Sequence, residues 1–227
     1  MTDPPRATTV LFDVDGTLID SNGAHAQAWT QALQEHGVNV DADQIRRLIG
    51  TGGDKLLPSV ANIGEDSRPG RIIAKRKKSI FDTLLPGLQP THGARALLEY
   101  LREQGVHLVI ASSADDRELD KLLRRANVDD LIRERASKDD AAASKPDPDI
   151  VQAALAKAHA PHDRCVLIGD TPYDIEAARR AGIDAIALRC GGYWDDENLR
   201  GAVAIFDDPA ALLSHWRQCD ASPRLTA

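Results

Sequence analysis

The stretch Thr9-Val10-Leu11-Phe12-Asp13-Val14-Asp15-Gly16-Thr17 decides the fold of this chain. Its apolar start predicts a short buried strand, and two carboxylates, Asp13 and Asp15, stand at the carboxyl end of that strand. Ligands bind at this edge of an open α/β sheet. Gly16 and Thr17 end the strand in a turn, where the backbone can approach a ligand closely. Because neighbouring carboxylates repel each other unless a cation or a proton joins them, the pair predicts a metal site.

Two simpler explanations of this acidic turn must be considered. An acidic turn after a strand is common on protein surfaces, where it needs no ligand. A calcium loop of the EF-hand type also begins with spaced acids, but it follows a helix and requires Glu at its twelfth position. Counted from Asp13, that position is Ala24, which offers no ligand atom, so an EF-hand is excluded. The choice between surface turn and site then depends on the ends of later strands.

Two polar residues, Ser112 and Ser113, follow the next predicted strand, Val106–Ala111. A serine hydroxyl there can donate to a phosphate oxygen beside a helix N-terminus, although serine before a helix is more commonly only an N-cap. Farther on, Lys145 stands in Ser144-Lys145-Pro146-Asp147-Pro148. Its ammonium is a point charge suited to neutralising a carboxylate and a phosphoryl group together, whereas a lone lysine is otherwise usually solvated.

A further strand, Cys165–Ile168, ends in Gly169-Asp170-Thr171-Pro172-Tyr173-Asp174. Thr171-Pro172 predicts an N-cap followed by the first helical residue, so a helix begins at the strand end. Asp174 falls in the first turn, where an acid can simply favour the helix dipole. The helix dipole does not explain Asp170, because Asp170 precedes the predicted N-cap residue Thr171.

Convergence of these strand ends would gather more negative charge than the chain itself can neutralise. Asp13, Asp15, Asp170 and Asp174 bring four carboxylates to one pocket, and Lys145 returns one positive charge. A divalent cation is then needed before a phosphate dianion can enter. Oxygen ligands without His or Cys favour Mg²⁺ over softer metals.

Glycines that end predicted helices indicate the topology. At Glu103-Gln104-Gly105-Val106 and Arg180-Ala181-Gly182-Ile183 a C-cap glycine precedes an apolar strand. This β-α alternation predicts an α/β fold with a doubly wound, Rossmann-like parallel sheet. Strands are expected near residues 9–13, 106–111, 131–135, 165–169 and 185–188, with one more at 202–206 and a final helix through Trp216.

The stretch from 20 to 86 does not alternate. It is interpreted as several helices in succession, at Asn22–His36, Ala42–Leu48, Lys55–Asn62 and Arg71–Leu85. A helical block directly after the first strand predicts a lid of residues 20–86 on a core of residues 1–19 and 87–227. Closure of such a lid would exclude water from the site.

Three features of the predicted lid have more than one interpretation. The basic run at Arg71 and residues 75–78 is expected to be a solvated helix face rather than a substrate-binding patch. His25 and Trp29, four residues apart, share a helix face, which favours core packing. The loop Gly50-Thr51-Gly52-Gly53-Asp54-Lys55 is equally well a plain turn or a substrate contact through Gly52 and Lys55.

Composition excludes several classes of function. A net charge of −7 and a pI near 5.5 argue against nucleic acid or a membrane surface as the main partner. No apolar stretch is long enough to span a bilayer, and residues 1–6 lack the apolar core of a signal peptide. Three scattered cysteines form no zinc pattern or disulfide framework. We therefore expect a cytoplasmic protein with reduced cysteines.

In order along the chain, Asp-x-Asp-Gly-Thr, strand-Ser, Lys-Pro and Gly-Asp-x-x-x-Asp resemble the four motifs of the haloacid dehalogenase (HAD) superfamily, from about Val10 to Leu188. The chain looks like the branch that contains phosphoglycolate phosphatases and beta-phosphoglucomutases. The resemblance implies a Rossmann-like HAD core with an inserted helical cap. It also implies a Mg²⁺-dependent phosphatase that hydrolyses a small phosphomonoester, phosphoglycolate or a sugar phosphate, through an aspartyl-phosphate.

The resemblance also implies a role for each motif residue. Asp13 is the expected nucleophile and a side-chain metal ligand, while Asp15 is the general acid and base and ligates through its backbone carbonyl. Asp170 is an expected ligand, and Asp174 a ligand or an anchor of its neighbours. Phosphoryl contacts are expected from Ser112, Ser113 and Lys145, and substrate contacts from Gly52 and Lys55.

Other functions fit the sequence less well. A dehalogenase is disfavoured, because such members lack the second acid, which is present here as Asp15. A beta-phosphoglucomutase-like mutase is the main alternative, but family mutases use a basic side chain in the cap loop, which is glycine-rich here, and Thr17 suits the phosphatases better. A purely binding role fits poorly with an intact Asp13 and Asp15 pair. The oligomeric state cannot be predicted from the sequence.

Overall fold

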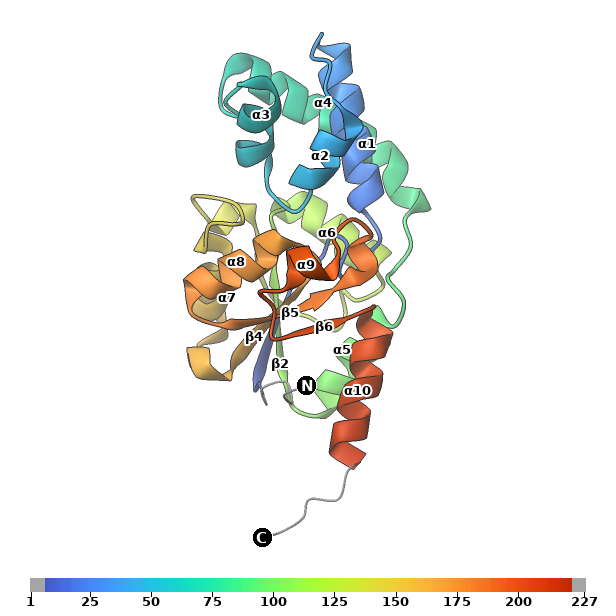
Figure 1. The fold of residues 1–227 in the computed structure, drawn as a ribbon, viewed down its shortest axis with the longest axis vertical. Helices are drawn as coiled ribbons and strands as arrows, with labels where there is room; N and C mark the ends of the chain where they lie inside the picture. The colour runs from blue at the N-terminus through green and yellow to red at the C-terminus, as the bar shows by residue number, and fades with distance from the viewer. Residues whose placement is uncertain (1–6, 222–227) are drawn as a thin grey trace.

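The computed structural model describes residues 7–221, which form an α/β fold around a six-stranded sheet (Figure 1). All neighbouring strands are parallel, in the order β3-β2-β1-β4-β5-β6. The strands are β1 Thr9–Phe12, β2 His107–Ala111, β3 Glu134–Ala136, β4 Cys165–Gly169, β5 Asp184–Leu188 and β6 Ala204–Phe206. The predicted doubly wound parallel sheet is therefore confirmed.

Helices cover both faces of the sheet. Val10 and Phe12 pack in a cluster with α5 (Ala94–Glu103), α6 (Asp116–Arg125) and α10 (Pro209–Ala221). Leu11 points to the opposite face, into a cluster with α7 (Asp149–Ala158) and α8 (Pro172–Ala181). Strands buried on both faces need nearly continuous apolar runs, which is why β1, β2 and β4 could be recognised in the sequence.

The four helices of the predicted lid lie together beyond the carboxyl ends of the strands (Figure 1). They are α1 Asn22–Glu35, α2 Ala42–Leu48, α3 Gly53–Ala61 and α4 Arg68–Leu84. A 3₁₀ turn, Leu85–Gly87, leads from α4 back toward the core, and a short helix, α9 (Asp196–Leu199), follows β5. The arrangement is that of a helical cap, and all four helices fall inside the predicted limits of 20–86.

Some predicted boundaries were wrong for identifiable reasons. The edge strand β3 begins at Glu134 rather than at residue 131, because Leu131 and Ile132 are buried in the core from the turn before it. Helix α4 begins at Arg68 rather than Arg71, because the Ser67 side chain caps it by accepting the Gly70 N–H at 3.1 Å. Helix α3 begins two residues before Lys55, and α10 extends beyond Trp216.

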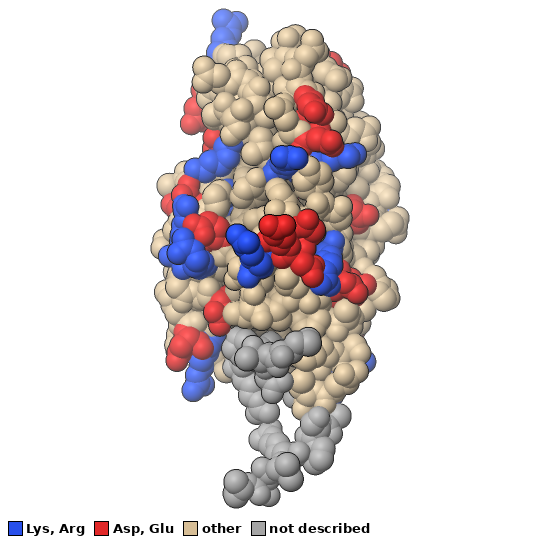
Figure 2. All heavy atoms as spheres, viewed as in Figure 1, with Lys and Arg blue, Asp and Glu red and all other residues tan. Residues whose placement is uncertain are grey.

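The surface agrees with the charge argument. Figure 2 shows acidic side chains gathered between basic ones on one face, with no continuous basic surface in this view. Within residues 7–221, no helix is both long and apolar enough to cross a membrane.

Candidate active site

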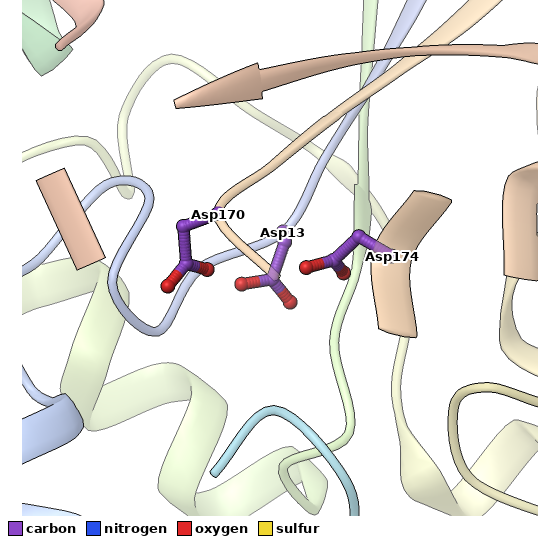
Figure 3. A group of neighbouring side chains, drawn as sticks. All are labelled: Asp13, Asp170 and Asp174. Atoms are coloured by element: carbon purple, nitrogen blue, oxygen red, sulfur yellow. The ribbon is translucent and has the colours of Figure 1, made fainter. Parts of the chain in front are cut away.

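The predicted acidic residues meet where β1 and β4 end. Asp13 follows β1, Asp170 follows β4, and Asp174 lies in the first turn of α8. The three carboxylates point into one space (Figure 3), and each offers an oxygen within 4.8 Å of the others. All three are buried, because β1 and β4 are adjacent central strands of the sheet.

Lys145 is fully buried between two of these acids. Its Nζ donates to Asp13 Oδ1 at 2.5 Å and to Asp174 Oδ1 at 2.7 Å. Burial alone would lower the pKa of Lys145, but the charges of the two carboxylates raise it above its ordinary value. The side chain is therefore a permanent positive charge in the site, not a solvated lysine.

Asp174 both caps a helix and contributes to the site. Its Oδ2 accepts the Thr171 N–H at 3.1 Å and the Thr171 hydroxyl at 2.6 Å, which completes a capping box at the start of α8. Its other oxygen accepts from Lys145. Helix capping therefore fixes the carboxylate whose second oxygen faces the buried charge cluster.

Asp170 is held by a residue that the motifs did not predict. Its Oδ2 accepts from Asn22 Nδ2 at 2.8 Å, and its Oδ1 lies 3.3 Å from Thr17 Oγ1. A Cβ on Gly16 would lie 2.2 Å from the Asp170 carboxylate, and one on Gly191 would lie 1.8 Å away. Two glycines are therefore needed for the backbone to approach this carboxylate so closely.

The charge balance of the cluster fits a divalent cation. Burial, and then the charges of Asp174 and Asp15, raise the pKa of Asp13 to about 7, against the opposing effect of Lys145. Burial and the neighbouring acids Asp174 and Asp13 also raise the pKa of Asp170 well above its ordinary value. Three buried carboxylates beside one ammonium leave uncompensated negative charge, so Asp13, Asp170 and Asp174 can hold a metal ion.

The side chain of Asp15 faces the cap instead. Its Oδ1 accepts from Ser21 Oγ at 2.5 Å and lies 2.8 Å from His25 Nε2 on α1. Burial alone would raise the pKa of Asp15, but the charge and hydrogen bond of His25, with the Ser21 hydroxyl, hold it below its ordinary value. His25 also stacks on Phe81 of α4, with ring centroids 4.0 Å apart. His25 therefore packs against Phe81, as core packing predicts, and also contacts the Asp15 carboxylate.

A cavity of about 80 Å³ lies between the cap and the strand ends. It is lined by Asp13, Asp15, His25, Trp29, residues 49–53, Lys77, Ser113, Ala114 and Glu118. The two predicted serines differ in position. The Ser113 Oγ is buried without a hydrogen-bond partner among the described residues, whereas Ser112 Oγ accepts the Ala114 N–H at 3.1 Å.

The glycine-rich cap loop is fastened to the core beside this cavity. The Gly52 N–H donates to Ser144 Oγ at 2.9 Å, and the Ser144 hydroxyl donates to Asp54 Oδ1 at 2.5 Å. Lys55 does not line the cavity. Its Nζ pairs with Asp147 Oδ2 at 2.5 Å, so Gly52 lies at the cavity while Lys55 ties α3 to the Lys-Pro-Asp-Pro segment.

Lys77 and Glu118 were not predicted as site residues. Lys77 belongs to the basic run expected to be solvated, but it is only 7% exposed, and its Nζ lies 3.2 Å from Glu118 Oε1. The expectation was wrong for this residue because Lys77 shares the buried face of α4 with Ile73 and Ile80. That helical spacing was the signal in the sequence that could have separated Lys77 from its neighbours.

Residues 10–188, which carry all of the acids described above, match the family model of the haloacid dehalogenase-like hydrolases. The chain belongs to this family. The superfamily resemblance seen in the motifs is thereby confirmed.

Two curated HAD relatives cover most of the chain. A phosphoglycolate phosphatase of Rhodospirillum rubrum is 28% identical over 217 residues, which are 92% of this chain and 89% of the relative. A phosphorylated carbohydrates phosphatase of Thermotoga maritima is 28% identical over 181 residues, which are 78% of this chain and 82% of the relative. The protein is therefore a HAD-family phosphatase that acts on small phosphate esters.

Solved structures agree with the fold. A hydrolase from Pseudomonas syringae superposes with a TM-score of 0.86 and is 31% identical, covering 92% of this chain and 98% of its own. A beta-phosphoglucomutase from Clostridium difficile has a TM-score of 0.81 at 19% identity, covering 93% of this chain and 96% of its own, and shows the fold alone. Both structures therefore share the fold of this chain over most of its length.

Proposed function

We propose that this HAD phosphatase hydrolyses phosphoglycolate or a sugar phosphate with Mg²⁺, through an aspartyl-phosphate on Asp13. The observation that carries the proposal is that Asp13 and Asp15 line the same cavity with different partners. Asp13 is held by Lys145 on the core side, and Asp15 by His25 on the cap side. Two carboxylates in different surroundings can serve as nucleophile and as general acid and base.

In the first step, Asp13 attacks phosphorus while the bond to the leaving oxygen breaks. The Asp13 oxygen that does not attack stays beside Lys145, which fixes the direction of attack. Asp15 passes a proton to the departing alcohol oxygen, and because its lowered pKa keeps it ionised at rest, that proton comes from His25 through their hydrogen bond. The hydrogen bond between Asp15 and His25 connects this carboxyl to a second group that can carry a proton.

In the second step, water attacks the same phosphorus and the bond to Asp13 breaks. Asp15, now ionised, takes a proton from that water, and its lowered pKa supports the ionised form. We propose that Lys145, which pairs with Asp13, and the Ser113 hydroxyl, which has no partner among the described residues, stabilise phosphoryl oxygens. We propose the same contribution for Ser112, through the turn that it braces.

Magnesium would be held by the side chains of Asp13, Asp170 and Asp174 and by the backbone carbonyl of Asp15. When bound, it would supply positive charge to the transferring phosphoryl group. Oxygen-only ligands support Mg²⁺ over softer metals. The names of the two relatives, a phosphoglycolate phosphatase and a phosphorylated carbohydrates phosphatase, support the two proposed substrate classes.

A mutase has less support. A second phosphate would need a cation at the cap loop, and the loop residues that line the cavity include Gly52 and Gly53, while Lys55 is paired with Asp147. Isomerisation of glucose 1-phosphate to glucose 6-phosphate would favour the mutase.

The proposal is tested by phosphate release from a panel of phosphomonoesters with MgCl₂, using the wild type and Asp13→Asn. We expect release by the wild type and none above background by the variant. Glucose 1-phosphate and phosphoglycolate belong in the panel, and circular dichroism checks that the variant is folded. Release by Asp13→Asn at the wild-type rate would contradict the proposal.

A further inference from the structure

The Glu118 side chain lines the cavity, although its position in the first turn of α6 would allow it to cap that helix instead. It is the third residue of α6, where a glutamate commonly turns back to the N-cap amide. Here its Oε1 lies 3.2 Å from Lys77 Nζ and 3.9 Å from His25 Nε2. The side chain is only 12% exposed and lines the cavity between core and cap.

The charges around the cavity favour hydrogen-bond donors in a ligand. Among the described residues that line it, three carry carboxylates, Asp13, Asp15 and Glu118, and the basic side chains are Lys77 and His25, whose Nε2 lies 2.8 Å from Asp15 Oδ1. Asp13 is already paired with Lys145. The Lys77 ammonium is occupied by Glu118 and by the Phe81 ring, whose centroid lies 4.8 Å away.

Because the cavity is small, a ligand that fills it lies close to Glu118. At about 80 Å³, the cavity is far smaller than the roughly 300–1,000 Å³ of common ligand pockets. A phosphoryl group at Asp13 leaves little room, so the rest of the ester lies close to the remaining lining residues, which include Asp15, Lys77 and Glu118. Like charges held that close to each other in a buried site repel strongly.

We infer that Glu118 selects the leaving group, accepting a hydrogen bond from a hydroxyl of an uncharged polyol or sugar and repelling a carboxylate. The inference rests on the proposed phosphatase function and narrows its substrate to sugar or polyol phosphates over phosphoglycolate. Lys77 holds the Glu118 carboxylate in place, and the aromatic rings of His25 and Phe81 lie beside the pair.

Two esters of nearly equal size separate these alternatives. Ethylene glycol monophosphate ends in a hydroxyl where phosphoglycolate ends in a carboxylate. We expect the wild type to hydrolyse the hydroxyl ester with a kcat/KM at least about tenfold higher, because the like charge is absent. Glu118→Gln keeps the size of the side chain and should raise the relative kcat/KM for phosphoglycolate by about tenfold.

Asp120→Asn is the matched control, since it removes one negative charge from the same helix at a half-exposed ion pair with Arg135. It should leave the ratio of the two esters unchanged. Equal or faster hydrolysis of phosphoglycolate by the wild type would overturn the inference while leaving the phosphatase proposal standing. An unchanged ratio in folded Glu118→Gln would do the same.

Failure of the proposed function gives a different result. If neither ester nor any member of the wider panel releases phosphate, the phosphatase proposal fails and the inference falls with it. If Glu118→Gln does not fold, the wild-type ratio of the two esters alone decides.

Discussion

The Nε2 of His25 lies 2.8 Å from Oδ1 of Asp15, so a cap helix supplies the closest basic group to a core carboxylate. The groups that hold the pKa of Asp15 below its ordinary value, His25 and the N-cap residue Ser21, belong to α1. The low pKa therefore depends on α1 lying over the strand ends. If Asp15 transfers protons as proposed, this contact would couple the position of the cap to proton transfer, so that cap closure would do more than exclude water.

His25→Gln tests that coupling. Without the charge and hydrogen bond of His25, burial should raise the pKa of Asp15, so the acid limb of the kcat profile should move to higher pH. At neutral pH, kcat should fall roughly tenfold to a hundredfold. Gln27→Ala, at an exposed position of the same helix, is the control and should keep the wild-type profile. An unshifted limb in His25→Gln would refute the coupling.

Lys145→Met should lower the free energy of unfolding by about 3–5 kcal/mol, because it leaves Asp13 and Asp174 buried without a counter-charge. Denaturant titration measures the loss. Lys157→Met breaks an exposed pair with Asp140 and should cost no more than about 1 kcal/mol. Equal losses for the two variants would mean that burial of Lys145 has no electrostatic consequence.

Magnesium binding should depend on pH. The raised pKa values of Asp13, about 7, and of Asp170 mean that protons compete with the ion at pH 6 and much less at pH 8. Thermal stabilisation by MgCl₂ should therefore be larger at pH 8. Without metal, the free energy of unfolding should fall as the pH rises from about 4 to 7. The reason is that Asp13 and Asp170 ionise at lower pH in the unfolded chain than in the folded protein. Asp170→Asn should lose most of the response to MgCl₂, and a full response in that variant would contradict the metal assignment.

Gly52→Ala should hinder cap closure. A Cβ there would lie 2.4 Å from an Asp54 oxygen and 2.8 Å from Ser144, although the backbone φ of −83° suits any residue. Displacement of the loop should lower kcat/KM roughly tenfold to a hundredfold. Gly64→Ala, where the added Cβ meets nothing within 4 Å, should change it little. Similar kinetics for the two variants would show that this contact does not position the cap.

The strand-end acids could be predicted because each follows its own apolar run. Asp13 and Asp170 directly follow strands that are buried on both faces, so the local pattern also located the site. Asp174 was ambiguous in the sequence, and the structure shows why. One of its oxygens caps α8 while the other accepts from Lys145.

The cap side of the site could not be predicted in the same way. Glu118 and Lys77 are 41 residues apart and meet only because α4 packs over α6. Lys77 sits in a basic run whose other members suit solvent, and His25 has a spacing that fits core packing. Contacts between helices that are distant in sequence depend on the packing of the whole cap, which single-residue patterns do not encode.

Phosphorylation of Asp13 can be detected with Asp15→Asn and 4-nitrophenyl phosphate. This leaving group needs no general acid, so Asp13 should be phosphorylated while hydrolysis, which needs Asp15 as a base, is slow. We predict a burst of nitrophenolate that matches the enzyme concentration, and a phosphoryl group on Asp13 in peptide mass mapping of the quenched sample. Absence of both burst and adduct, together with continued turnover by Asp13→Asn, would show that Asp13 is not the nucleophile.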